Sequence, residues 1–284
     1  MSKSNIFTIS PMSHTISLAA GDTYDGYITI ANPANAEENF DYRITVAPYA
    51  VAGEDYVADF SSKTARTQIA DWITIENPVG TLRPNESEKI HFVVNIQETA
   101  PAGGQYAAIV IGSNSEAEIS SGVSVNNVFE MASIIYAEIT GNTIEDGAVL
   151  ENSIPGFVTN MPIRVSTLLT NTGNAHEIAR IGLEVRNLFS STLIYPQPDE
   201  SGIVDEVIMP ETSRYVTRDI TNVSPLGIYE VTQTVDYLGE VNQLRQIVVA
   251  CPIWFMVLAI VTITAVITSI IFRIKSSRRK RHIV

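Results

Sequence analysis

The 284-residue chain has few of the residues that cross-link a fold or bind metals. It contains one cysteine, Cys251, and four histidines that lie far apart, His14, His91, His176 and His282. A single cysteine cannot form an intrachain disulfide, so the folded part must be held by core packing alone. The histidines show neither His-x-x-x-His nor His-Glu-x-x-His spacing, so the sequence predicts no metal site.

Motifs for catalysis are missing as well. The chain has no Gly-x-Ser-x-Gly elbow and no glycine-rich phosphate loop. Its acidic pairs, such as Glu37-Glu38 and Asp205-Glu206, lack the alternating Asp spacing of a calcium loop and are interpreted as solvated charge. We therefore predict a protein that is not an enzyme and that has no catalytic residues and no cofactor. An enzyme with an acidic site of unfamiliar pattern is the catalytic alternative.

One segment lacks charge altogether. Residues 247–272 contain no charged side chain, and a basic tail follows at 273–284. A hydrocarbon layer of about 30 Å needs roughly 20 apolar residues in a helix, so residues 247–272 are predicted to span a membrane. Trp254 is predicted to lie at the membrane interface. The basic residues expected to anchor the other end are Arg273, Lys275, Arg278, Arg279, Lys280 and Arg281.

The same basic residues predict an orientation. The rule that positive charge stays inside places the tail in the cytoplasm and the 246-residue body outside, in a single-pass cell-membrane protein. Export of the body needs a signal peptide, and Met1 to Thr15 has no apolar core of the required length. Either a signal was removed or the start is misassigned. The competing topology is a tail-anchored protein with a cytosolic body.

Positive charge is scarce in the body. Without the tail, 12 Lys and Arg face 31 Asp and Glu, a formal charge of −19. Such a surface repels nucleic acid, so no nucleic-acid partner is expected. Cationic partners fit it better.

What the body does contain is a series of short β-type runs separated by turns. The run from Lys89 to Ile96 alternates apolar and polar residues, which indicates a half-buried strand. Only Thr64 to Trp72 is interpreted as a loop or short helix. The predicted fold class is all-β: two tandem immunoglobulin-like β-sandwiches, residues 1–141 and 142–246, followed by the transmembrane helix.

An internal repeat supports two sandwiches. Three pairs of elements recur in the same order at offsets of 139, 126 and 123 residues. They are the corners at Asn32 and Asn171, the turns Leu82-Arg-Pro84 and Ile208-Met-Pro210, and the Gly-x-Tyr strands at Tyr106 and Tyr229. The first copy therefore carries an insertion of about 13 residues, most simply within Pro48 to Trp72.

This insertion holds the candidate binding residues. They are Tyr49, Tyr56, Phe60, Lys63 and Arg66. Their aromatic faces and positive charge suit sugar rings or a protein partner. The alternative is that the aromatic side chains fold back and form a small satellite core.

The turns of the chain are similar to those of a known family. The similar segments are Pro11, Leu18–Asp22, Tyr27–Asn32, Trp72, Leu82–Pro84 and Pro101–Val110. They resemble the peptidoglycan-binding domain of WxL-interacting surface proteins, and Met209–Ser213 with Leu226–Tyr229 resembles, more loosely, that family's partner-binding domain. The resemblance implies a non-enzymatic bacterial surface protein with one domain near the cell wall and one facing a protein.

These observations lead to a functional hypothesis. We expect a membrane-anchored cell-surface binding or adhesion protein that engages cell-wall glycan, another surface protein, or both. Its partners would be the lipid bilayer through one span and the wall glycan or surface protein, and oligomers are compatible with this architecture. The alternative is a structural subunit of a membrane protein assembly that binds through sheet edges or the transmembrane helix.

Overall fold

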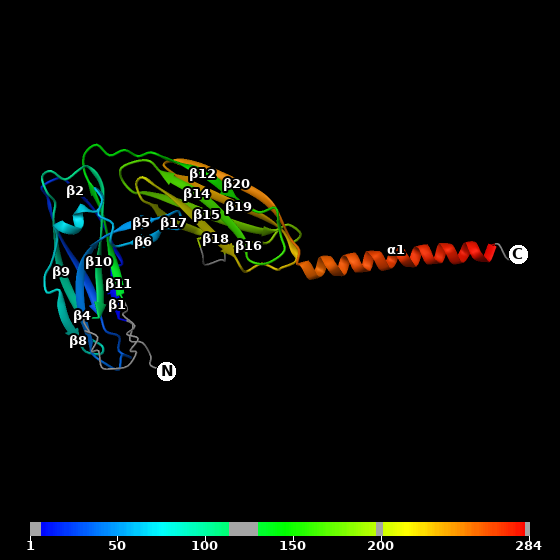
Figure 1. Ribbon diagram of the computed structural model, residues 1–284, viewed down its shortest axis with the longest axis horizontal. Coiled ribbons are helices and arrows are strands. Elements are labelled where there is room, and N and C mark those ends of the chain that lie inside the picture. The colour runs from blue at the N-terminus through cyan, green and yellow to red at the C-terminus, as the bar shows by residue number, and fades with distance from the viewer. Residues whose placement is uncertain (1–6, 114–129, 197–200, 282–284) are drawn as a thin grey trace. The chain divides into compact units, whose positions relative to one another are not determined.

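The body of the protein is built from β-strands, and an α-helix closes the chain (Figure 1). The computed structural model describes residues 7–113, 130–196 and 201–281. This confirms the all-β body with one C-terminal helix. The chain divides into two compact units. Unit 1 comprises Met1–Gly147, Thr170–Glu177 and Ile208–Arg214, and unit 2 comprises Ala148–Leu169, Ile178–Val207 and Tyr215–Val284. The predicted boundary at residues 141 and 142 remains a prediction.

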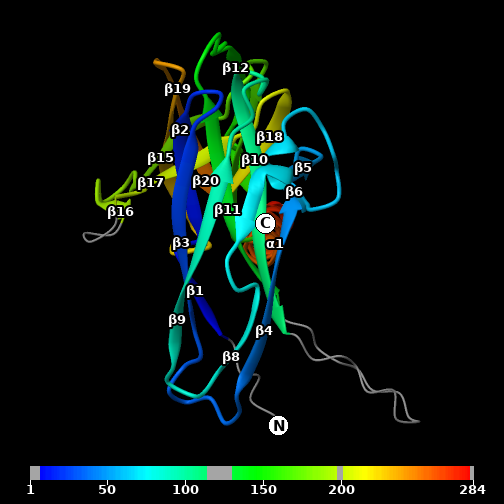
Figure 2. The ribbon, with the colours of Figure 1, turned by 90° about the vertical axis from the view of Figure 1, so that its left-hand side faces the viewer.

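Two sheets of unit 1 pack around one core, and their strands lie side by side in Figure 2. The first sheet has the order β1 (Thr8–Ser10), β3 (Thr23–Ala31), β9 (Ser87–Asn95) and β7 (Ile73–Ile75). The second has the order β2 (Ser13–Leu18), β11 (Glu130–Ile139), β10 (Gly103–Ser113), β4 (Phe40–Pro48) and β8 (Val79–Leu82). Strand β2 runs parallel to β11, and the other pairings of this sheet are antiparallel.

The predicted alternation in β9 is confirmed. Ile90, Phe92 and Val94 are buried in the core, because successive strand residues point to opposite faces. His91 lies on the other face. Its Nε2 is 2.9 Å from Asp25 Oδ1 and its Nδ1 is 3.2 Å from Glu76 Oε2, so it is held between two carboxylates.

Two glycines inside the strands of unit 1 lie opposite aromatic rings. Gly26 pairs with Phe92, and Gly80 pairs with Tyr42. A Cβ atom on Gly26 would lie 2.1 Å from Cζ of Phe92. The missing side chain therefore leaves the space that the ring fills, which compensates for the poor strand propensity of glycine.

The insertion between Pro48 and Trp72 forms a small hairpin and one helical turn. Strands β5 (Ala50–Ala52) and β6 (Val57–Asp59) pair antiparallel, and the 3₁₀ helix η1 spans Gln68–Trp72. Ile69 and Trp72 of η1 are buried in the core of unit 1. The interpretation of Thr64 to Trp72 as a loop or short helix is confirmed.

The remaining strands form two further sheets. One has the order β12 (Gly147–Ser153), β14 (Ile163–Asn171) and β18 (Thr212–Ile220). The other has the order β13 (Phe157–Val158), β20 (Glu240–Ala250), β19 (Gly227–Tyr237), β15 (Glu177–Asn187) and β16 (Leu193–Tyr195), with β17 (Ile203–Ile208) also on β15. The core of unit 2 includes Val165, Val185 and Tyr229.

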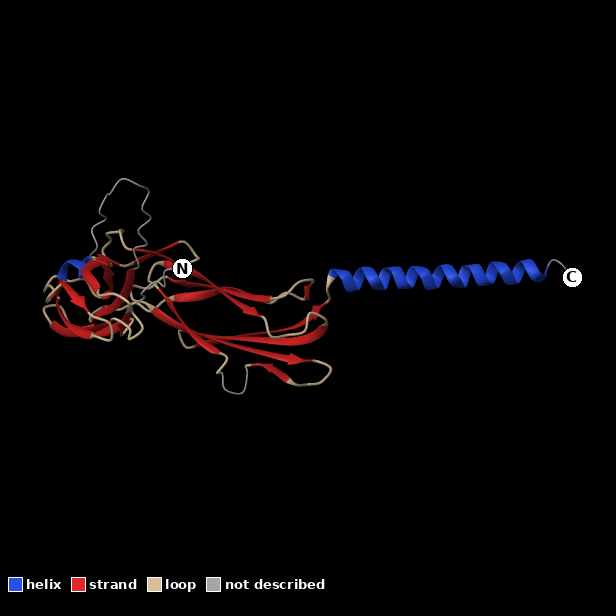
Figure 3. Ribbon diagram, turned by 90° about the horizontal axis from the view of Figure 1, so that it is seen from below, coloured by secondary structure: helices blue, strands red, loops and turns tan. Residues whose placement is uncertain are grey.

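The C-terminal helix begins later than predicted. Helix α1 spans Ile253–Arg281, the long blue helix of Figure 3, and Ile253–Arg273 is long and apolar enough to cross a membrane. Residues 247–250, which were predicted to open the span, belong to β20. Val248 and Ala250 are buried in the core of unit 2, and Ala250 pairs with Gly227. Pro252 then separates strand from helix, because it has no N–H to continue the β-ladder.

Both corners of the internal repeat use one buried asparagine in the same way. Asn32 Nδ2 donates to the carbonyl oxygen of Leu82 at 3.0 Å, and Asn171 Nδ2 donates to that of Ile208 at 2.9 Å. Leu82 and Ile208 are themselves equivalent positions of the repeat. The turns that follow match too, since Asn85 and Glu211 both have a left-handed backbone, with φ of 66° and 59°.

We predict that Asn32→Ala destabilises the protein by about 1–3 kcal/mol, because the carbonyl groups of Leu82 and Glu38 lose a buried donor. Urea unfolding of the full chain in detergent, followed by circular dichroism, measures this change. Asn35→Ala is the matched control, since Asn35 is exposed on the same corner. Equal stability of the two variants would contradict a structural role for the Asn32 amide.

Candidate functional site

The candidate site is a pocket of about 300 Å³ in unit 1. Four segments line it: Tyr49–Val51 at the start of the β5–β6 hairpin, Thr64–Thr67 before η1, Tyr106 of β10, and the turn Met209–Thr212. Apolar and aromatic side chains with a few polar groups are typical of a binding pocket. The insertion thus supplies two of the four walls.

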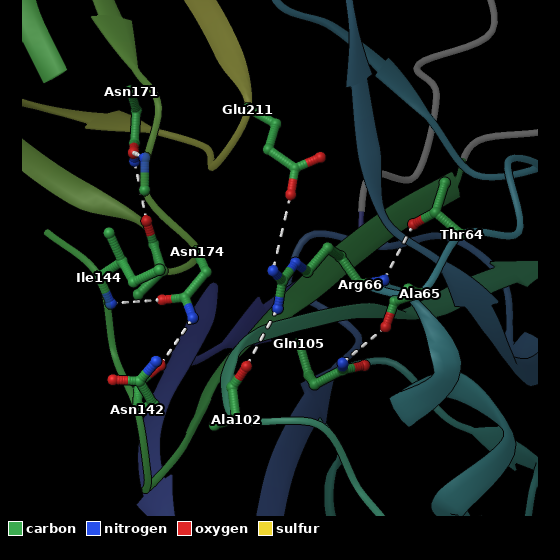
Figure 4. A network of polar contacts seen from close by, with 12 residues as sticks. Thr64, Ala65, Arg66, Ala102, Gln105, Asn142, Ile144, Asn171, Asn174 and Glu211 are labelled. Carbon is green, nitrogen blue, oxygen red and sulfur yellow. Dashed lines mark hydrogen bonds and ion pairs between the residues drawn. The ribbon is translucent and has the colours of Figure 1, made fainter. Parts of the chain in front are cut away.

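Arg66 and Glu211 are the charged residues in the lining of this pocket. Nη1 of Arg66 donates to the carbonyl oxygen of Ala102 at 3.2 Å, and its Nη2 lies 3.6 Å from Oε1 of Glu211 (Figure 4). The backbone N–H of Arg66 donates to Oγ1 of Thr64 at 3.1 Å, which fixes the loop from which the side chain leaves. The contacts with Ala102 and Glu211 hold the guanidinium group in place. A guanidinium group has five N–H donors, more than these two contacts use.

Glu211 reaches Arg66 from a strained turn. It follows Pro210, and its φ of 59° lies in the left-handed region that a residue with a Cβ adopts at a cost of about 1 kcal/mol. The equivalent residue of the first repeat, Asn85, is of a type that tolerates this backbone. A glutamate in such a position gives up stability and places an exposed carboxylate beside Arg66.

Tyr56 joins the hairpin to the same turn. Its hydroxyl accepts the N–H of Met209 at 2.8 Å and lies 2.5 Å from Oγ1 of Thr212. The guanidinium carbon of Arg214 lies 4.6 Å from the centre of the Tyr56 ring. Burial raises the pKa of the Tyr56 hydroxyl, so it stays protonated. Tyr56 therefore has a structural role at the edge of the pocket.

Behind the pocket lies a cluster of rings. The His176 ring is 5.7 Å from that of Tyr106 and 5.3 Å from that of Tyr136, and its Nδ1 is 3.4 Å from the Tyr106 hydroxyl. Burial lowers the pKa of His176, although the nearby Glu138 opposes this, and burial raises the pKa of both tyrosines. Gly104 makes room for Tyr106, since a Cβ there would lie 1.8 Å from the hydroxyl oxygen.

The five residues predicted from the insertion divide between the two alternatives. Tyr49 and Arg66 line the pocket. Tyr56 folds back, as the satellite-core alternative requires, and Phe60 lies half-exposed with its ring 6.0 Å from that of Tyr49. Lys63 is exposed and is not part of the pocket wall.

Nothing in the local sequence marks Tyr136, His176 or Glu211 directly as neighbours of the site. The only signal was the internal repeat, which marked the corners from which His176 and Glu211 come.

The predicted membrane-anchor residues lie on α1. Trp254 and Arg273 are exposed along it. The side chains of Lys275, Arg278, Arg279, Lys280 and Arg281 lie outside the described residues. Within the described ranges, no three His, Cys, Asp or Glu residues gather as a metal site would require.

Comparison with known proteins returned solved structures only. No protein-family model matches the sequence, and no curated protein matches it. The SafA pilin–SafB chaperone complex of Salmonella enterica is 12% identical, with a TM-score of 0.42, over 88% of this chain and 98% of that one. The CsuC–CsuE chaperone–tip adhesion subunit complex of Acinetobacter baumannii is 11% identical, with a TM-score of 0.40, over 86% of this chain and 98% of that one. The Escherichia coli chaperone DraB is 10% identical, with a TM-score of 0.38, over 84% of this chain and 97% of that one.

These findings correct two predictions. The similarity to WxL-interacting surface proteins is wrong, because the comparisons return pilus chaperones and no such family. The hypothesis of a cell-surface adhesion protein engaging wall glycan falls with it. The alternative of a structural subunit that binds through sheet edges or the transmembrane helix stays a prediction. Turns built from Pro, Gly and Asn carried the resemblance, and such turns recur wherever sandwich strands reverse.

We predict that Glu211→Asn is more stable than Glu211→Gln by about 1 kcal/mol, because Asn tolerates the left-handed backbone and Gln does not. Both variants lose the contact with Arg66, so their difference isolates the backbone strain. Urea unfolding of the full chain in detergent measures it. Equal stability would show that the turn carries no strain.

A second prediction concerns pH. Because burial lowers the pKa of His176 in the folded state, the unfolded chain binds its proton first as the pH falls below about 6.5. The stability that neutral His176 contributes is present above this pH and is lost as the pH falls towards the folded pKa. We expect His176→Gln to make the free energy of unfolding less steep between pH 7 and pH 5, by at most about 1.4 kcal/mol per pH unit. His14, whose pKa burial also lowers, contributes equally to both proteins and cancels in the comparison. An unchanged slope would contradict a neutral, buried His176.

Proposed function

We propose that the protein is a non-catalytic protein that binds a polypeptide segment of a partner protein in the pocket of unit 1, and that α1 holds it at a membrane. The observation that carries this proposal is the pocket itself. An inserted hairpin and a strained turn meet there beside Arg66, and the rings of Tyr49 and Tyr106 line the same pocket. Rigid aromatic walls around an arginine are typical of protein-binding hot spots.

The chemistry of the pocket suits a segment with both apolar and charged side chains. The rings offer apolar contact at a low cost in side-chain entropy. Arg66 suits a carboxylate or carbonyl oxygen of the partner, and the exposed Glu211 suits a cationic side chain. The net charge of −13 attracts a partner with a basic surface from a distance. The chaperone SafB forms a complex with the SafA pilin, and the chaperone CsuC forms one with the tip adhesion subunit CsuE. We propose the same broad class of activity, binding of another polypeptide, for this protein.

We further propose the finer organisation that the sequence predicts. Two immunoglobulin-like sandwiches, residues 1–141 and 142–246, would form the body. The body would lie on the outer side of the membrane and the basic tail in the cytoplasm. Support for this orientation comes from the asymmetry of charge, since the residues before α1 carry one arginine, Arg245, against Asp236 and Glu240.

Site-specific photocrosslinking in the cells that make the protein tests the proposal. A benzophenone residue at Val51, in the pocket wall, should form an adduct with one partner polypeptide. The same residue at Val57, exposed on the same hairpin but outside the wall, should not. We expect Arg66→Gln to lower the yield about tenfold, as the loss of a charged hydrogen bond of about 1.5 kcal/mol implies.

The matched control is Arg83→Gln, which removes the same charge from an exposed turn. It should leave the yield unchanged, and the expression level and thermal unfolding of each variant show that it is folded. Equal crosslinking from Val51 and Val57, or a yield indifferent to Arg66→Gln, would contradict binding in this pocket. Adducts with glycan alone would contradict a polypeptide ligand.

A further inference from the structure

An exposed apolar surface surrounds the end of unit 2 from which α1 departs. An open hollow of about 580 Å³ lies there, with Phe189, Leu226, Ile228, Val249 and Cys251 in its lining. The side chain of Phe189 is 79% exposed, although a large aromatic side chain is stabilised by burial. Large apolar groups that gather at one exposed place mark a contact surface.

The chain segments at this end are also free of charge. Residues 153–163, 187–196, 220–229 and 246–252 contain no Asp, Glu, Lys or Arg, in a chain with 49 such residues. Backbone hydrogen bonds hold these segments together: the N–H of Leu188 donates to Ile228 at 2.9 Å, and that of Cys251 donates to Val158 at 2.9 Å. Four separate stretches of sequence thus contribute to a single uncharged end.

The connection to α1 places this end close to any membrane that the helix enters. Cys251 lines the hollow and Ile253 opens the helix, so two peptide units, at most about 7.6 Å, separate them. The N–H of Phe255 and that of Met256 both bond to the carbonyl oxygen of Pro252, so the helix begins without a flexible linker. Trp254, whose ring type favours the membrane interface, is the second residue of the helix.

We propose that this uncharged end of unit 2 is a membrane-contact surface, with Phe189 and Leu226 inserted at the boundary between headgroups and acyl chains. The occupant is the lipid of the bilayer that α1 crosses. A protein partner is less favoured, because the surface is joined directly to a membrane helix. The inference rests on the proposed membrane anchoring. It goes beyond it, because a spanning helix alone does not require the β-body to touch lipid.

Depth-dependent fluorescence quenching tests this surface. In a Cys251→Ser background the full chain carries one new cysteine, from Phe189→Cys, Leu226→Cys, Val241→Cys or Ile263→Cys, labelled with an environment-sensitive fluorophore. Each protein is reconstituted into phosphatidylcholine vesicles that contain no quencher, a lipid with a nitroxide near the headgroup end of its acyl chain, or a lipid with a nitroxide near the methyl end, which reaches the middle of the bilayer. Val241 is the matched control, since it is exposed and apolar, yet lies ten residues from Cys251 along β20, about 33 Å.

We expect the labels at 189 and 226 to be quenched at least about twofold more strongly than the label at 241, because only they enter the interfacial region. Ile263 lies in the middle of the apolar part of α1, Ile253–Arg273, and reports the span itself. If its label is quenched while those at 189 and 226 behave like 241, the membrane contact is wrong and the anchoring stands. If the label at 263 is also unquenched, α1 does not cross the bilayer, and both the anchoring and the contact are wrong.

Discussion

The side-chain amide of Asn171 is the interaction on which the candidate site depends. Its Nδ2 donates to the carbonyl oxygens of Ala175 and Ile208, and its Oδ1 accepts the N–H of Gly173. One fully buried side chain therefore joins the corner that carries His176 to the turn that carries Glu211. Three hydrogen bonds made inside a low-dielectric core hold both segments in register, because leaving any of these groups unpaired there is costly.

Next to the segments that Asn171 joins, Glu211 has a strained backbone and an exposed side chain. Its carboxylate lies in solvent beside Arg66. Neither feature improves folding, since an exposed ion pair contributes little. A turn with asparagine, as at Asn85 in the first repeat, would fold more easily. The cost is consistent with a residue retained for what it presents to a partner.

The distribution of charge gives the molecule its second organising feature. The body carries an excess of acidic residues, whereas residues 153–163, 187–196, 220–229 and 246–252 have no charged side chain. Packing of the core does not explain this distribution of charge, because charged loop residues can be solvated at either end of a sandwich. Without disulfides, each unit depends on its own apolar core, and the uncharged end of unit 2 adds apolar surface outside that core.

Features that depend only on neighbouring residues could be predicted before the fold was known. Alternation fixed the face of β9, the uncharged run predicted a spanning helix, and the repeat marked the two asparagine corners. All three follow from local periodicity and turn chemistry. The start of α1 was misplaced, because residues 247–250 are apolar enough for either a helix or a strand, and pairing with β19 decided for the strand.

Only the tertiary structure brought Arg66, Tyr106, His176 and Glu211 into one place. They lie as many as 145 positions apart in the sequence, and no spacing rule connects them. The resemblance to a surface-protein family failed for the same reason: turn motifs report how a chain reverses, and not which side chains meet. Which residues form a site depends on contacts between distant strands, and such contacts are set by core packing rather than by local sequence.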